Sequence, residues 1–187
     1  MVIMCRAFMF DREPQRDKAC ATTVLDREGK AMTTTGLVFE AEPGFEERVR
    51  ESFSRLTLMR TIGARLVKVA PGEVDIDMPV RDDLKQQHGY VAAAIVTAIV
   101  DTACGYAAMS LMPVGATVVT VEYKVNFISP ARGERLLAHG RVVKPGRALT
   151  VCAGEVYAVS GAAPKAVATL LGTMVALQDV AEVPARR

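Results

Sequence analysis

The sequence predicts an α+β fold in which one antiparallel sheet wraps around a single long buried helix. Residues 91–112 carry no charge except at Asp101, which is typical of a helix buried on all sides. Segments in which apolar and polar residues alternate lie before and after this helix. Such alternation is typical of strands with one buried face, and a sheet closed around the helix accommodates this order of elements.

The remaining elements follow in order along the chain. Apolar residues at helical spacing between residues 45 and 56 predict an amphipathic helix. Strands are expected at 62–69 and 73–78, joined by a Pro71-Gly72 turn, and a polar loop at 81–89 leads into the buried helix. Four more strands are expected after the helix, at 119–128, 134–143, 149–158 and 166–177.

The main domain is expected to span residues 44–179. An N-terminal appendage at 1–43 is poorly defined by its pattern, with a hairpin expected between 21–25 and 37–40. Residues 180–187 are expected to form a frayed tail.

Composition excludes several classes of function. Half of the 187 residues are hydrophobic and 24% are charged, which is a globular ratio. A net charge of +2 and the absence of Trp argue against a nucleic-acid-binding protein. Four scattered cysteines without a CxxC pair, and only two histidines, argue against a metal site or a disulfide framework. No cofactor is implied.

Residues 91–112 are long enough to span a bilayer, which takes about 20 apolar residues. An aspartate at the bilayer centre costs roughly 2.5–3.5 kcal/mol, however, so we interpret this segment as a helix inside a globular fold, with no membrane partner. The N-terminus lacks the apolar region and cleavage site of a secretory signal, and a cytoplasmic location is therefore expected.

Three motifs carry a family resemblance. The run Gln86–Ala103 resembles the central helix of hotdog-fold acyl-CoA thioesterases of the phenylacetic-acid-pathway (PaaI-like) branch. Thr120–Ala131 resembles the strand after that helix, which ends in a Pro-Ala turn, and Val142–Arg147 is a weaker third match. The resemblance spans about residues 60–177 and implies hydrolysis of an acyl- or aryl-CoA thioester to the free acid and coenzyme A.

The chain departs from the family at one point. The family usually has His-Gly-Gly or His-Ala-Gly at the helix start, with its acid nine residues after the histidine. Counting back nine residues from Asp101 gives Ala92, so the triplet is Ala92-Ala93-Ala94 here. His88 lies four residues too early to replace that histidine and is interpreted as a surface residue. Either the enzyme works without the histidine, or part of the activity is lost.

The resemblance implies roles for several residues at the site. Asp101 becomes the general base or nucleophile, although a buried aspartate bonded to the backbone is the structural alternative. The backbone N–H of Ala93 becomes the oxyanion donor, and Ala94 lies where the ligand approaches the backbone.

Two polar residues could assist this chemistry. Gln86 aligns with a residue that orients substrate or water, and a solvated loop glutamine is the alternative. Thr120 aligns with a residue that positions the water, and a threonine on the sheet surface is the alternative. Cys104 is interpreted as a small core residue.

A distance argument predicts an oligomer. Ala93 and Asp101 are eight residues apart on one helix, which places them about 12 Å apart along its axis. Groups acting on one carbonyl must lie within hydrogen-bond reach of it, so one helix cannot supply both. Two antiparallel helices from two protomers can, which predicts a homodimer or a homotetramer built as a dimer of dimers.

Basic residues outnumber acids between residues 120 and 150, which suits the phosphates of coenzyme A. The basic residues are Lys124, Arg132, Arg135, Arg141, Lys144 and Arg147. Arg147 and Lys144, at the Pro145-Gly146 turn, are the candidates for substrate binding.

Two other functions are compatible with the predicted fold. A non-catalytic acyl-CoA-binding protein would explain Ala92 at the position of the motif histidine. A dehydratase is disfavoured, because that chemistry in this fold uses a histidine with an acid. The sequence does not identify the acyl group.

Overall fold

The computed structural model of the chain describes residues 23–25, 31–33, 40–161, 163–178 and 180. The chain divides into two compact units, residues 1–38 and residues 39–187. In the first unit, β1 (Thr23–Leu25) pairs antiparallel with β2 (Ala31–Thr33). The second strand of this hairpin was expected at 37–40, and this was wrong, because the strand paired with β1 is 31–33; residues 37–39 lie outside the described residues. Residues 181–187 of the expected tail also lie outside them.

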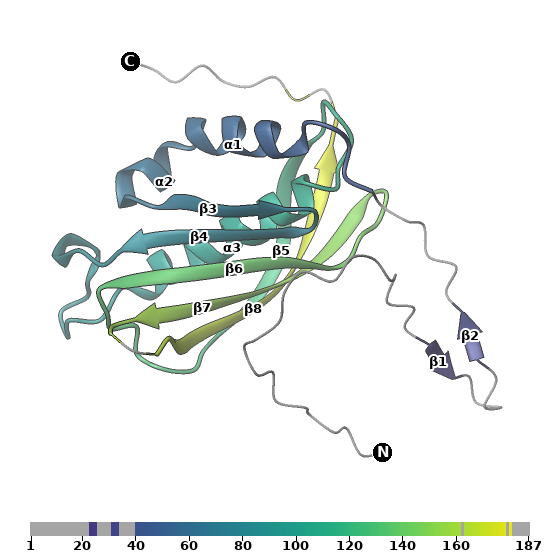
Figure 1. The fold of residues 1–187 in the computed structure, drawn as a ribbon. Coiled ribbons are helices and arrows are strands. Elements are labelled where there is room, and N and C mark those ends of the chain that lie inside the picture. The colour runs from purple at the N-terminus through teal and green to yellow at the C-terminus, as the bar shows by residue number, and fades with distance from the viewer. Residues whose placement is uncertain (1–22, 26–30, 34–39, 162, 179, 181–187) are drawn as a thin grey trace. The chain divides into compact units, whose positions relative to one another are not determined.

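The second unit is a six-stranded antiparallel sheet curved around α3 (Ala93–Met109), as Figure 1 shows. The strand order is β3-β4-β6-β7-β8-β5. The bounds of the strands are β3 Arg65–Ala70, β4 Glu73–Pro79, β5 Thr117–Phe127, β6 Arg135–Lys144, β7 Leu149–Val159 and β8 Lys165–Leu177. This architecture confirms the predicted fold class.

The core lies between α3 and the concave face of the sheet. In β7 every second residue from Thr150 to Ala158 is buried, and these residues face the helix. The closest approach is at Gly140 on β6, where an added Cβ would lie only 2.3 Å from the backbone carbon of Ala103. Glycine is therefore required at this position, because any side chain would collide with the backbone of α3.

Two helices precede the sheet, α1 (Phe45–Arg55) and α2 (Thr57–Ile62). The first was expected, but the second was not, and the strand expected at 62–69 is in fact β3, which begins at Arg65. Met59 and Ile62 of α2 are buried in the core. Arg48 of α1 donates to the carbonyl oxygens of Met109 and Met112 at 3.2 and 2.6 Å, at the carboxyl end of α3. This contact ties α1 to the central helix.

Strand β5 contains an irregularity that decides which residues face the helix. Thr120 pairs with Met174 and Glu122 pairs with Thr173, so Val121 is an extra, bulged residue. Val118 and Val125 both pack against the core, although strict alternation would place them on opposite faces. Because of the bulge, Thr120 before it and Val125 after it both face the helix side of the sheet.

The expected polar loop before α3 contains a short 3-10 helix, Asp82–Leu84. Among the described residues, no helix combines the length and the apolarity needed to cross a membrane.

Candidate active site

The acid of the central helix is bonded to the strand that passes beside it. The hydroxyl Oγ1 of Thr120 on β5 donates to Oδ1 of Asp101 on α3 at 2.8 Å, and it also lies 3.3 Å from Sδ of Met174. The other oxygen of Asp101 has no hydrogen-bond donor among the described residues. The structure therefore places Thr120 on the helix side of the sheet, and not on the outer surface that the sequence left open.

Burial raises the pKa of Asp101 above its usual value, and the hydrogen bond from Thr120 offsets part of this rise. The carboxylate is half-buried, so its ionised form is poorly solvated and a better base than an exposed aspartate. Cys104, three residues further along α3, is fully buried, and burial raises the pKa of its thiol. Cys104 is therefore a thiol at neutral pH and a core residue, not a nucleophile.

The start of α3 presents unpaired backbone donors. Ala92 is the N-cap and makes no side-chain cap, while its own N–H donates to the carbonyl of Leu84 at 2.9 Å. The N–H groups of Ala93 and Ala94 have no acceptor among the described residues, and both residues are exposed. Donors at a helix N-terminus favour negative charge, so this position suits a developing oxyanion.

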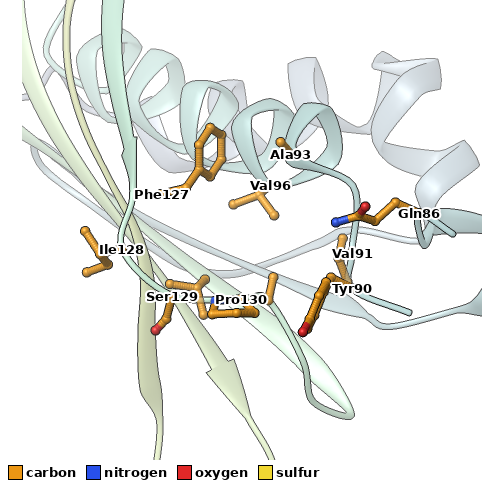
Figure 2. Close-up of a pocket in the computed structure, with 11 residues that line it drawn as sticks. Gln86, Tyr90, Val91, Ala93, Val96, Phe127, Ile128, Ser129 and Pro130 are labelled. Carbon is orange, nitrogen blue, oxygen red and sulfur yellow. The ribbon is translucent and has the colours of Figure 1, made fainter. Parts of the chain in front are cut away.

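A groove opens beside this helix start, with a volume of about 420 Å³. Figure 2 shows Gln86, Ala93, Val96 and Phe127 among the residues that surround it. Most of the lining is apolar, which suits an acyl or aryl group, and the amide of Gln86 supplies a polar group. Of the predicted site residues, Gln86 and Ala93 thus lie together in this groove.

Asp101 and Thr120 do not line the groove. Eight residues of helix separate Asp101 from Ala93, a rise of about 12 Å. One chain therefore contains two candidate half-sites, the acid with its threonine and the donors with the groove, and it does not bring them together.

Lys144 and Arg147 lie far from the backbone donors at the start of α3. Lys144 is the last residue of β6 and is exposed. Arg147 lines a hollow of about 220 Å³ with Leu111 and Met112, just beyond the carboxyl end of α3. The 17 residues of α3 place this hollow about 25 Å from the helix start.

Neither His88 nor His139 lines the groove. His88 is exposed, and its ring nitrogen is 3.5 Å from the amide of Gln87. His139 on β6 bonds Asp75 on β4 through Nδ1 at 2.5 Å, and this hydrogen bond raises the pKa of His139. In the described part of the chain, no group of three or more His, Cys, Asp or Glu side chains is arranged to hold a metal ion.

Sequence reasoning missed three residues in or beside the groove, namely Tyr90, Phe127 and Arg132. The guanidinium of Arg132 lies 4.1 Å from the centroid of the Tyr90 ring, and Tyr90 lines the groove. The sequence signal for Arg132 was only its membership in a basic stretch, and Tyr90 gave none. Phe127 was expected as a strand residue, not as part of a binding surface.

Comparison with known proteins agrees with this architecture. The sequence model of the Thioesterase superfamily matches residues 88–165. A Halobacterium salinarum protein whose name proposes esterase activity is 32% identical over 110 residues, which cover 56% of this chain and 71% of that protein.

Solved structures extend the likeness. A thioesterase family protein from Silicibacter pomeroyi is 48% identical with a TM-score of 0.71, over 72% of this chain and 99% of that one. The PaaI protein of the Escherichia coli phenylacetic acid degradation operon shares the fold, with 18% identity and a TM-score of 0.65 over 74% and 96% of the two chains.

The hotdog fold and the matches to known proteins together define the class of protein. The chain belongs to the thioesterase superfamily. The resemblance that the sequence motifs indicated is thereby confirmed, and the chain falls among thioester hydrolases at the level of the family.

Proposed function

We propose that this protein hydrolyses an acyl- or aryl-CoA thioester to the free acid and coenzyme A. The observation that carries the proposal is the pair of Asp101 and Thr120, a half-buried carboxylate held by one hydroxyl on an otherwise uncharged helix. Family membership supports thioester hydrolysis, and the apolar groove at the helix start supports an acyl or aryl group.

The proposed reaction needs no group beyond the protein and water. Asp101 accepts a proton from a water molecule while the water oxygen attacks the thioester carbonyl carbon. The N–H of Ala93 from the partner protomer donates to the oxyanion that forms. Collapse of this intermediate breaks the carbon–sulfur bond, and the thiolate takes the proton held by Asp101 and leaves as coenzyme A, which regenerates the carboxylate. Attack by Asp101 itself, followed by hydrolysis of the anhydride, is the variant in which it is the nucleophile.

The other predicted residues have supporting roles in this proposal. Thr120 fixes one oxygen of Asp101 and so aims the other at the water. Gln86 orients the substrate or the water, and Ala94 leaves room where the ligand meets the backbone.

A second copy of the chain completes the site in this proposal. Among the described residues, β5 is hydrogen-bonded only to β8, so its other edge is open to another strand. Four apolar side chains of β5 are each about half exposed, namely Val119, Val121, Tyr123 and Phe127. An open edge with exposed apolar residues supports a homodimer or a dimer of dimers.

An antiparallel partner also gives Lys144 and Arg147 a role. Within one chain, Lys144 and Arg147 lie at the carboxyl end of α3, away from the backbone donors at its start. A partner helix that runs antiparallel would bring the partner's Lys144 and Arg147 toward these donors. We propose that the partner's pair contacts the phosphates of coenzyme A.

Non-catalytic binding of acyl-CoA is the second candidate function, because Ala92 caps α3 without any side-chain group. The double change Ala92→His plus Ala94→Gly restores the family motif. Under the catalytic proposal it should raise turnover on the order of 10²-fold, since a hydrogen bond made in the transition state is worth that much. Tight binding without hydrolysis, in both the wild type and the double variant, would favour the binding protein.

The direct test is hydrolysis of a panel of aryl- and alkyl-CoA thioesters, followed by detection of the free thiol. Asp101→Asn should lower the turnover of the best substrate by roughly 10²–10⁴-fold. Asp82→Asn, at an exposed carboxylate, is the matched control and should leave turnover unchanged. An Asp101→Asn protein within threefold or so of wild type would remove Asp101 from the mechanism.

Mixed dimers test the shared site. Ala93→Pro removes the proposed donor, and proline fits the first position of a helix, where the extended backbone of Ala92 already suits a following proline. A dimer of one Asp101→Asn chain and one Ala93→Pro chain should recover one intact site of the two. If both groups acted within one chain, this dimer would be inactive.

A further inference from the structure

We propose that Arg132 binds an anionic group of the substrate at the mouth of the groove, and that Tyr90 holds it there. The proposal rests on the proposed function, and it concerns a residue that is part of neither half-site. The anion is an oxyanion, supplied either by a phosphate of coenzyme A or by a carboxylate on the acyl group.

Arg132 is held in place before any ligand binds. Its guanidinium lies over the Tyr90 ring, 4.1 Å from the centroid, well within the range of a cation–π contact. The two residues flank a backbone hydrogen bond, in which the N–H of Val91 donates to the carbonyl of Ala131 at 3.0 Å. The loop before α3 and the loop after β5 are therefore joined at this point.

The segment that carries Tyr90 is itself braced. The carbonyl of Tyr90 accepts a hydrogen bond from the N–H of Gln86 at 2.8 Å, and Lys85 forms a β-bridge with Val91. Gly89 in the tip of this turn has a φ of 78°, a conformation that glycine adopts without strain. Because both sides are fixed by backbone hydrogen bonds, part of the entropy cost of placing the Arg132 side chain is met in the folded protein.

The guanidinium over the Tyr90 ring keeps N–H donors for a ligand. A guanidinium carries five N–H donors, and contact with a single ring leaves donors for bidentate recognition of an oxyanion. No carboxylate among the described residues lies within ion-pair distance of Arg132. In contrast, Arg135 three residues later is bound to Asp77 at 2.7 Å and is not available.

The position of Arg132 relates it to the substrate. It directly follows Ala131, which lines the groove together with Tyr90 and Pro130. Ala93, the proposed oxyanion donor, lines the same groove. A substrate with its carbonyl at Ala93 therefore extends past Tyr90, where an anionic substituent or carrier meets the guanidinium.

Four thioesters separate the two sources of the anion. Butyryl-CoA and succinyl-CoA differ in the acyl carboxylate, and the N-acetylcysteamine esters of the same two acids lack the phosphates. Kinetic constants are measured for wild type, Arg132→Gln and Tyr90→Leu. Arg141→Gln, at an exposed arginine on the outer face of β6, is the matched control.

Arg132→Gln should raise KM about tenfold for every ester that carries the recognised anion, with kcat within about twofold, since hydrogen bonds to charged groups are worth this much. A rise confined to the two CoA esters identifies a phosphate. A rise confined to the two succinyl esters identifies a carboxylate. Tyr90→Leu should produce the same pattern with a smaller rise, and Arg141→Gln should produce none.

An equal rise for butyryl-N-acetylcysteamine, which carries no anion, would overturn the proposal, and so would unchanged KM for all four esters. If the wild type hydrolyses none of the four esters, they are titrated as ligands by calorimetry, while the wider panel of aryl- and alkyl-CoA thioesters decides the proposed function. The same pattern in Kd then supports the role of Arg132, and equal or absent binding by wild type and variant overturns it.

Discussion

Replacing Thr120 by valine removes the hydroxyl that donates to Asp101 while keeping the branched shape of the side chain. Because this hydroxyl stabilises the ionised carboxylate, its loss should raise the pKa of Asp101 further. If Asp101 acts as the base, its ionised form is the active one. The acid limb of the pH profile of kcat/KM should therefore move to higher pH.

The size of the shift follows from the contact. A hydrogen bond to a charged group contributes roughly 1.5–3 kcal/mol, and each pKa unit corresponds to about 1.4 kcal/mol. The carboxylate of Asp101 is only half-buried, so water replaces part of the lost interaction, and we expect the lower end of the range. The predicted shift is about one pKa unit. Below the acid limb the Thr120→Val enzyme should be about tenfold slower than wild type.

The assay is the pH profile of kcat/KM between pH 4 and 9 with one thioester, for proteins shown to be folded by their Tm. Thr173→Val is the matched control, because the Thr173 hydroxyl donates to the exposed Glu122 on the outer side of the sheet at 2.6 Å. A 13C NMR titration, with the Asp101 signal assigned by its absence in Asp101→Asn, reads the same pKa without catalysis. An acid limb that stays in place in folded Thr120→Val would refute the reasoning.

Three further predictions concern stability. Asp101→Asn should raise the Tm at pH 8, and the gain should shrink toward pH 4, because a raised carboxyl pKa penalises the native state increasingly as pH rises from the unfolded-state pKa and fully above the raised pKa; thermal unfolding across pH checks this, and a gain independent of pH would contradict it. Gly140→Ala should cost about 3 kcal/mol or prevent folding, because its Cβ would lie 2.3 Å from a backbone carbon of α3. Gly105→Ala, with 3.9 Å to the nearest atom, should be neutral or stabilising by up to about 1 kcal/mol, and urea unfolding of both variants measures the contrast. His139→Gln should lower stability by up to about 1 kcal/mol at pH 6 and by less at pH 9, because the bond to Asp75 raises the pKa of His139 and its contribution is lost as pH rises through that value; equal losses at both pH values would count against it.

The order of elements could be predicted because burial alone determines most of them. The segment around Asp101 carries no other charge, which favours an enclosed helix, and each strand after it is ten residues or longer. The short helix α2 was missed for the converse reason. Its six residues cover fewer than two turns, so no helical period is visible in the sequence. Its buried apolar residues, Met59 and Ile62, would also fit a strand.

The candidate site could be predicted only in part. Asp101 was evident as the one charge on a buried helix, but the orientation of Thr120 depends on the bulge at Val121. A bulge is a backbone irregularity with no fixed residue pattern, so alternation could not locate it. The contact of Tyr90 with Arg132 joins segments 42 positions apart, and only the folded chain brings them together.

Because the sheet wraps around α3, we expect the site to be lost only when the whole domain unfolds. Elements at the centre of a domain usually open only when the whole cooperative unit unfolds, and their amides exchange hydrogen most slowly. Asp101 lies on such an element, so its amide should be among the slowest to exchange. A core substitution far from the site would then lower the number of active molecules while leaving the turnover of each folded molecule unchanged.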